Sequence, residues 1–244
     1  MSTTVPDPDR IVQKLRELQR QVRDAVVASR AMGDVADVKK ATAADTIYGI
    51  DVVIEPVLEA FLEEWGRELP MVVVAEGLEP EVKAFPHGAR EADATVRLII
   101  DPVDGTRGLM YDKRAAWALA GVAPNKGDAT RLRDIEVAVM TELPTSKMGF
   151  GDVLWAVKGR GAHAVREDLR TGAPVPLPIR PSRADTIAHG FATVSNFFPG
   201  TKRLSGDLME HLVANLLGRA DVTKAMVFDD QYISTGGQFY ELIV

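Results

Sequence analysis

The stretch LIIDPVDGTRG, Leu98–Gly108, places two carboxylates three positions apart directly after a short apolar run. Asp101 and Asp104 repel each other at this spacing unless a positive charge lies between them. Gly105 allows the chain to approach a bound group closely, and Thr106 adds a hydroxyl group beside it. The stretch therefore predicts a buried strand that leads into a site for cations.

Other acidic residues also stand where a predicted strand ends. Glu76 follows MVVVA, and Asp229 and Asp230 follow the apolar run MVF. Strand ends that lie side by side in a sheet would bring such residues together at one edge. Hard cations such as Mg²⁺ prefer oxygen ligands and usually keep some waters and substrate phosphate oxygens. Converging carboxylates would hold one to three such ions, which indicates metal-assisted hydrolysis of a phosphate ester.

Each acidic segment also has a simpler interpretation. Asp-Pro-x-Asp-Gly is a common turn sequence, Glu76 alone is typical of a solvated loop, and Asp229-Asp230 could cap a helix. The coincidence of all three at strand ends favours the metal site. The haloacid dehalogenase-like phosphatases use Asp-x-Asp-Gly-Thr, whose acids share one side of a strand. Asp101 and Asp104, three apart across a proline, are not expected to do so, which counts against that class.

Hydrophobic periodicity predicts helices before and after a run of strands. Apolar residues recur at helical spacing from Asp9 until Gly33, and again from Ile47 to Trp65, where Pro56 predicts a kink or a late start. Strands are expected at 71–76, 96–101, 115–123, 134–142 and 151–159, with a hairpin turn at 158–162. A proline-rich connection at 173–183 precedes a strand near 187–194, a helix near 205–218 and a last segment, 231–244, that starts like a helix. This order predicts a mixed, layered α/β or α+β protein.

The composition excludes several classes of protein. The 244 residues carry a net charge of −6, so the bulk charge does not indicate a nucleic-acid surface. There is no cysteine, which excludes disulfides and thiolate metal sites, so any metal must use oxygen or one of four histidines. No apolar stretch approaches the length of a membrane span, and the N-terminus has no apolar signal region. We expect a soluble, cytoplasmic protein with neither a nucleic acid nor a membrane as partner.

Six segments spread over nearly the whole chain carry a resemblance to a known family. They are DTIYGID (45–51), VVVAEGLE (72–79), DPVDGT (101–106), WAVKGRGAHAV (155–165), RLSGD (203–207) and FDDQYISTGGQ (228–238). In this order they resemble the opening of a helix, the strand with its Glu, the Asp-Pro-x-Asp-Gly-Thr core motif, the Lys-Gly-x-Gly-Ala hairpin, the substrate loop and the last metal-ligand segment of the inositol monophosphatase family. That family is grouped with fructose-1,6-bisphosphatase and the 3′-phosphoadenosine phosphatases.

The resemblance implies a fold and a metal site. The fold would be a layered αβαβα sandwich of the sugar-phosphatase type, and the cofactor would be two or three Mg²⁺ ions. Asp101 would bridge two ions, and Glu76 with the carbonyl group of Val103 would complete the first. Asp104 and Asp230 would hold the second ion.

The resemblance also implies catalytic and substrate-binding residues. Glu76 and Thr106 would orient the attacking water, and Asp51 would lie beside the site on a third, weaker ion. The substrate-binding set would be Gly105, Thr106, Arg203, Gly206 and Asp207, with the backbone N–H groups of the first two on the phosphate.

Several departures from the family pattern affect this expectation. Asp207 stands where a hydroxyl residue is usual, and Asp229 could be the last ligand in place of Asp230. The basic loop 107–114 either changes the substrate region or is simply solvated. The family continues for several elements beyond the segment that ends this chain, so the C-terminal part is expected to be shortened.

We therefore expect one phosphatase unit over 1–244, with a metal-site subdomain at 9–172 and a second subdomain, incomplete at its C-terminus, at 184–244. The expected function is that of a Mg²⁺-dependent phosphomonoesterase, a hydrolase of a small phosphorylated metabolite such as an inositol phosphate, a sugar phosphate or a nucleotide 3′-phosphate. A homodimer is what the resemblance suggests. The alternative is a catalytically impaired or regulatory homologue that binds metal or ligand without turnover, and a plain structural domain is a third interpretation.

Overall fold

The computed structural model describes residues 4–30, 38–41, 46–76, 78, 80–180, 182–218 and 226–244, with the backbone alone at 30, 38–41, 46–48 and 51. The chain forms two compact units. The first comprises Met1–Ile179 and Ser234–Leu242, and the second comprises Arg180–Ile233 and Ile243–Val244. Among the described residues, no helix is both long and apolar enough to cross a membrane.

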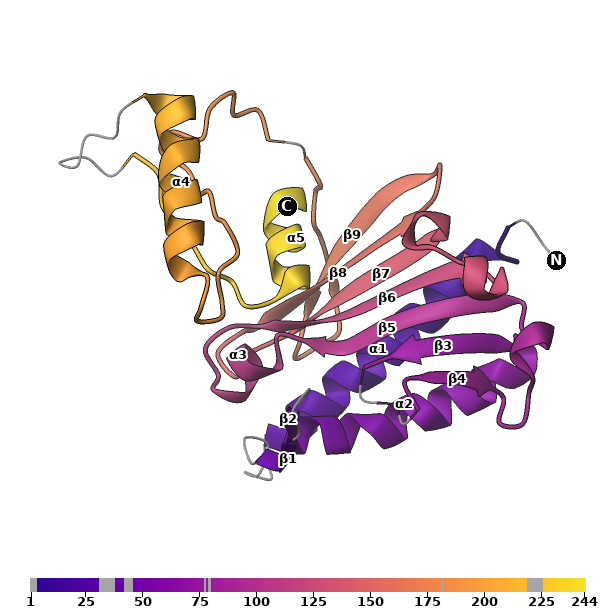
Figure 1. Cartoon of the computed structure of the whole chain (residues 1–244). Coiled ribbons are helices and arrows are strands. Elements are labelled where there is room, and N and C mark those ends of the chain that lie inside the picture. The colour runs from indigo at the N-terminus through magenta and orange to yellow at the C-terminus, as the bar shows by residue number, and fades with distance from the viewer. Residues whose placement is uncertain are drawn as a thin grey trace. The chain divides into compact units, whose positions relative to one another are not determined.

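The first unit is built on an eight-stranded sheet with the order β10-β9-β8-β7-β6-β5-β3-β4 (Figure 1). Its strands are β3 (Met71–Ala75), β4 (Val82–Phe85), β5 (Val96–Asp104), β6 (Ala116–Pro124), β7 (Val137–Leu143), β8 (Phe150–Val157), β9 (Gly161–Asp168) and β10 (Pro174–Pro176). β3 and β5 pair in parallel, and the other neighbouring pairs are antiparallel. Antiparallel neighbours need only short connections, so β5 to β10 follow one another as a meander.

Short elements complete this unit. β1 (Val38–Ala41) and β2 (Thr46–Tyr48) form a separate two-stranded antiparallel sheet. The 3₁₀ helices η1 (Glu91–Asp93), η2 (Gly127–Ala129) and η3 (Leu132–Asp134) lie between strands, and the short helix α3 (Thr106–Met110) follows β5 directly.

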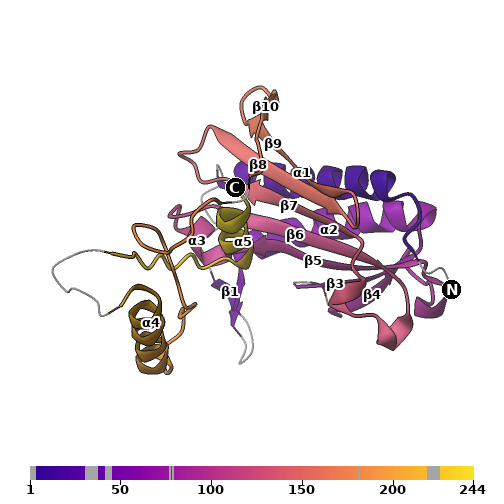
Figure 2. The ribbon, with the colours of Figure 1, turned by 90° about the horizontal axis from the view of Figure 1, so that it is seen from above.

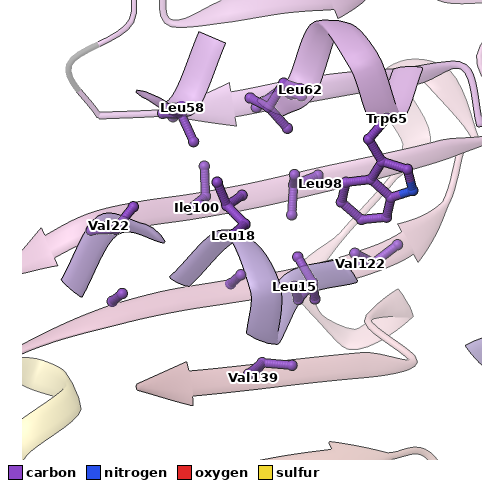
Figure 3. Packing of buried hydrophobic residues seen from close by; sticks show 14 of the residues in the cluster. Leu15, Leu18, Val22, Leu58, Leu62, Trp65, Leu98, Ile100, Val122 and Val139 are labelled. Atoms are coloured by element: carbon purple, nitrogen blue, oxygen red, sulfur yellow. The ribbon is translucent and has the colours of Figure 1, made fainter. Parts of the chain in front are cut away.

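Two long helices, α1 (Pro8–Arg30) and α2 (Gly49–Glu68), cover one face of the sheet (Figures 1 and 2). The apolar side chains of α1 recur at helical spacing and are at most 1% exposed: Ile11, Leu15, Leu18, Val22 and Val26. Figure 3 shows three of them, Leu15, Leu18 and Val22, in one layer with Leu58, Leu62 and Trp65 of α2 and with Leu98, Ile100, Val122 and Val139 of the sheet. Burying one such side chain fully contributes about 1.5–3 kcal/mol, so this layer is the main source of stability in the unit.

A buried polar contact fixes α1 on β7. Gln19, which is 0% exposed, donates from Nε2 to the carbonyl oxygen of Val139 at 3.1 Å and accepts from the hydroxyl of Thr141 at 2.7 Å. A buried amide is costly unless its hydrogen bonds are made, so this pair of bonds sets where the helix can sit along the strand.

The opposite face of the sheet carries the helix α5 (Thr235–Ile243). Trp117 of β6 alternates with the core residues Ala116 and Ala118 and therefore points to this face. The ring of Tyr240 lies on the ring of Trp117 with a centroid separation of 4.8 Å. The C-terminal segment of the described chain thus packs on the sheet, far in sequence from the strands that it covers.

The second unit contains the helix α4 (Lys202–Leu217). Four leucines on α4, at positions 204, 208, 212 and 216, are exposed. The strand expected near 187–194 is wrong, because the described residues there form only a single parallel bridge between Phe191 and Phe228. Three backbone hydrogen bonds join the two segments around this bridge, from His189 to Met226, from Phe228 to Gly190 and from Ala192 to Phe228.

Most of the expected elements are confirmed. The mixed α/β sandwich class, both N-terminal helices, the five strands and the hairpin between β8 and β9 are present, and α2 runs through Pro56. β4 and β10 were not expected. β10 lies in the proline-rich connection, where a proline is tolerated because an edge strand leaves its outer N–H positions unpaired. The predicted end of the first helix at Gly33 lies outside the described residues.

A glycine in α2 provides a test of this packing. A Cβ atom on Gly66 would lie 2.7 Å from the backbone carbon of Phe85 and 2.7 Å from the nitrogen of Pro86. Helix propensity alone predicts that alanine stabilises this position by about 1 kcal/mol. We expect Gly66→Ala instead to lower the free energy of unfolding by about 1–3 kcal/mol, because backbone atoms cannot rotate away from the clash. Gly206→Ala in α4, where nothing lies within 4 Å of the new Cβ, is the helical control in denaturant unfolding. A gain in stability for Gly66→Ala would contradict the packing.

Candidate functional site

Glu76 and Asp101 leave neighbouring parallel strands at the same end. Ala75 of β3 is paired with Ile100 of β5, so Glu76 and Asp101 occupy the next position on each strand. Glu76 is exposed and Asp101 is half-buried. The register therefore brings two of the predicted acidic residues to the same level of the sheet.

A β-bulge brings Asp104 to the same face as Asp101. Asp101 is paired with Leu119 and Asp104 with Trp117, so three steps along β5 match two steps along β6. Partners two apart on a regular strand point to one face, and this is the face that α5 covers. The expectation that acids three apart across a proline lie on different sides is therefore wrong. The bulge supplies the extra residue, so the spacing alone does not separate this chain from the haloacid dehalogenase-like class.

The residues around the bulge hold one another by short local hydrogen bonds. The N–H of Val103 donates to Oδ1 of Asp101 at 3.0 Å, and the hydroxyl of Thr106 donates to the carbonyl oxygen of Val103 at 2.7 Å. Gly105 precedes α3 with φ 96°, a left-handed conformation that glycine adopts without strain. The Val103 side chain lies in the core and is 5% exposed. The segment is a tight turn, and it is also a rigid support for its two carboxylates.

Asp104 is bound by the start of α5. Its Oδ2 accepts a hydrogen bond from the hydroxyl of Ser234 at 2.7 Å and another from the N–H of Gly236 at 2.6 Å. Among the described residues, no group donates to Oδ1 of Asp104. The sequence-based reasoning missed both partners. The only available signal was the Ser-Thr-Gly-Gly segment, in which a serine precedes a helix as a typical N-cap.

The other predicted site residues belong to α2 or to the second unit. Nothing is described for the side chain of Asp51, although its backbone belongs to α2. Arg203, Gly206 and Asp207 lie in the first two turns of α4 in the second unit. Asp229 and Asp230 also belong to that unit, and the carboxylate of Asp229 accepts hydrogen bonds from Thr193 and Gln231.

The residue types of this part of the first unit are those that a hard cation prefers. Asp101, Asp104 and Glu76 offer carboxylate oxygens, and the carbonyl oxygen of Val103 keeps one lone pair beside its bond from Thr106. Both donors to Asp104 among the described residues reach Oδ2, so Oδ1 is the oxygen that would face an ion. No group of three or more acidic or histidine side chains among the described residues is close enough to form a complete metal site on its own. Two cavities of about 260 and 280 Å³ lie elsewhere on the first unit and are not lined by these acids.

The sheet face under α5 carries a row of polar groups that begins at Asp104. Across the strands, Trp117 is paired with Glu142, and Asp152 is paired with Arg166. Arg166 binds both oxygens of the buried Asp152 at 2.7 Å, which raises the pKa of the guanidinium group. Burial and the hydrogen bond to Asp152 raise the pKa of the Tyr240 hydroxyl. α5 is thus attached to carboxylates from β5 and from β8.

Glu142 is the titratable group of this row near neutral pH. Burial raises its pKa from 4.5 to about 7, and the charge of Asp152 adds to the effect. The N–H of Asp152, which donates to Oε2 of Glu142 at 3.1 Å, opposes the shift. The cost of removing the ionised carboxylate of Glu142 from water is therefore larger than the stabilisation that the hydrogen bond from Asp152 gives it.

The chain shares its fold with solved structures of a fructose-1,6-bisphosphatase and of SuhB proteins. Fructose-1,6-bisphosphatase of Leishmania major in its holo form matches with a TM-score of 0.66 at 14% identity, over 97% of this chain and 72% of that chain. SuhB of Mycobacterium tuberculosis matches with a TM-score of 0.60 at 13% identity, over 98% and 75%. The extragenic suppressor protein SuhB of Bartonella henselae matches with 0.59 at 14% identity, over 96% and 74%. No protein-family model and no curated protein matches the sequence. At these identities the likeness establishes the fold, and the sugar-phosphatase fold expected from the resemblance is confirmed.

The raised pKa of Glu142 predicts a pH-dependent loss of stability. The unfolded chain releases this proton near pH 4.5 and the folded chain near pH 7, so between these values the folded state binds more protons. The contribution of Glu142 to stability therefore falls as pH rises through this window. We expect Glu142→Gln to raise the melting temperature relative to the wild type at pH 8 and to change it least at pH 5. Thermal unfolding at both pH values measures this, with the exposed Glu64→Gln as control. Equal shifts at both pH values would contradict the assignment.

Proposed function

We propose that this chain is a Mg²⁺-dependent phosphomonoesterase that hydrolyses a small phosphorylated metabolite. The observation that carries the proposal is the bulge in β5, because it sets Asp101 and Asp104 on one face beside the strand end that carries Glu76. The fold shared with fructose-1,6-bisphosphatase and SuhB supports this choice over other uses of clustered acids. An inositol phosphate, a sugar phosphate and a nucleotide 3′-phosphate are the substrate classes that we consider.

Different residues of the first unit would bind the cations and orient the attacking water. Asp101, Asp104, Glu76 and the Val103 carbonyl would hold the cations, which supply charge stabilisation and lower the pKa of a bound water. The hydroxyl proton of Thr106 is committed to the Val103 carbonyl, so the oxygen of Thr106 is left to accept a hydrogen bond from the attacking water. The carboxylate of Glu76 would accept a second hydrogen bond from the same water and take its proton.

The remaining assignments come from the resemblance. The N–H groups of Gly105 and Thr106 would bind the phosphate, and Arg203, Gly206 and Asp207 would contact the alcohol part of the substrate. Asp51 would support a third ion. The last ligand would be Asp230, with Asp229 as the alternative.

Turnover is the direct test of the function. Purified protein is incubated with a panel of phosphate monoesters, with Mg²⁺ and after treatment with a chelator. We expect hydrolysis of at least one ester with Mg²⁺ and none without it. Mg²⁺ binding without hydrolysis of any ester would favour the non-catalytic homologue instead.

Mg²⁺ should stabilise the folded protein. Carboxylates gathered on one face repel in the absence of cations, and a ligand that binds only the folded state raises its melting temperature by mass action. We expect a rise on titration of Mg²⁺ into chelator-treated wild type and a much smaller rise in Asp101→Asn. Asp128→Asn, in the 3₁₀ helix η2 where the side chain is exposed, should respond like the wild type. A melting temperature that stays constant up to millimolar Mg²⁺ would rule out the metal site.

Thr106 should affect the rate rather than binding. Thr106→Val keeps the shape of the side chain but removes the hydroxyl that would orient the water. We expect kcat to fall by about 100-fold, the scale of a misplaced reacting group, with little change in KM. Thr106→Ser retains the hydroxyl and should keep most of the activity. A change confined to KM in Thr106→Val would contradict the role in steady-state kinetics.

A further inference from the structure

The start of α5 is a specific contact with one carboxylate. Ser234 is the N-cap of the helix, since its carbonyl accepts from the N–H of Gln238 at 3.1 Å and its Oγ accepts from the N–H of Gly237 at 2.9 Å. The Oγ therefore keeps its proton for Asp104, to which it donates at 2.7 Å. Ser234 is 3% exposed, so water does not compete for this bond.

A second observation supports the same contact independently. A Cβ atom on Gly236 would lie 2.7 Å from Cβ of Trp117 and 2.8 Å from Cδ2 of Leu119. The first turn of α5 therefore lies against β6 as closely as a backbone can, and only glycine permits this. Because Trp117 is the strand partner of Asp104, the close approach brings the Gly236 N–H to within 2.6 Å of the carboxylate.

These bonds orient the carboxylate of Asp104. Two donors fix Oδ2, whereas Oδ1 receives no donor from the described residues. The positive end of the α5 dipole also lies next to this negative group. The two hydrogen bonds already restrict the rotation of this carboxylate. Little further rotational entropy is therefore lost when an ion binds to Oδ1.

We propose that Ser234 and Gly236 are positioning residues that orient Asp104 for its cation, so that docking of α5 and binding of the ion stabilise each other. The proposal rests on the proposed metal-dependent function. Partners that orient a metal ligand typically account for a 10- to 100-fold effect on metal affinity. The coupling must be reciprocal, so the ion should also strengthen the contact of α5 with the sheet.

The far end of α5 offers a matched control. The hydroxyl of Tyr240 donates to Asp152 and its ring lies on Trp117, and among the described residues it makes no hydrogen bond with Asp104 or Ser234. Tyr240→Phe removes two hydrogen bonds of the same helix, the one to Asp152 and the one from Arg166, and leaves the donors to Asp104 in place. It therefore separates a general loosening of α5 from the loss of the Asp104 contact.

The test is calorimetric titration of Mg²⁺ into chelator-treated protein, with unfolding curves of each variant to check that it is folded. We expect Ser234→Ala to weaken Mg²⁺ binding by about 10-fold or more, Ser234→Thr to restore part of the affinity because it keeps the hydroxyl, and Tyr240→Phe to bind like the wild type. Gly236→Ala should weaken binding through displacement of the helix. As a readout apart from Mg²⁺ affinity, we expect Mg²⁺ to slow hydrogen exchange at the amides of Gly236 and Gly237 in the wild type.

The outcomes separate the two proposals. If the wild type binds Mg²⁺ and hydrolyses phosphate esters while Ser234→Ala binds with unchanged affinity, the positioning role is overturned and the proposed function stands. If Tyr240→Phe weakens Mg²⁺ binding as much as Ser234→Ala, the contact at Asp104 has no special role and the inference is again overturned. If the wild type binds no Mg²⁺, both proposals fail.

Discussion

The bulge at Pro102 and Val103 is the constraint on which the candidate site depends. Side chains alternate along a strand, so without the extra residue Asp104 would point into the layer of α1 and α2. Val103 would then lose its place in the core, where it is 5% exposed. Pro102 suits the bulge because it has no N–H to contribute to the ladder. One irregular step therefore keeps two carboxylates on one face and an apolar side chain on the other.

Acidic groups gathered on this face of the sheet repel one another and are partly removed from water. The fold compensates each of them in a different way. Asp152 has a bidentate partner in Arg166, Glu142 has its pKa raised by burial, and Asp104 receives two hydrogen bonds from the start of α5. Asp104 and Glu142 each keep one carboxylate oxygen without a donor among the described residues, but burial raises the pKa of Glu142. At one end of the row, Asp152 of β8 and Arg166 of β9 form a structural ion pair. At the other end, Asp104 of β5 is a carboxylate that suits a cation.

The parts that the sequence predicts well are those with a local periodic signal. The 3.6-residue spacing of apolar residues identified α1, and β-branched runs identified the central strands, because burial acts there on consecutive residues. β4 and β10 are short edge strands whose side chains are largely outside the core, so their pattern is weak. The acids at β3 and β5 were predicted from strand ends alone. The bulge was not, because pairing with β6 decides it, and α5 was foreseen only as the start of a helix.

The residues that complete the site were harder to predict, for a physical reason. Ser234 and Gly236 lie 130 and 132 positions after Asp104, and each has an ordinary local role as an N-cap or a small helical residue. Their second role arises only when β6 supplies the surface on which Gly236 must fit. A local pattern cannot encode a contact that needs three separate segments. The same separation in sequence gives the contact its consequence: Asp104 is oriented only when β5, β6 and the first turn of α5 are all in place.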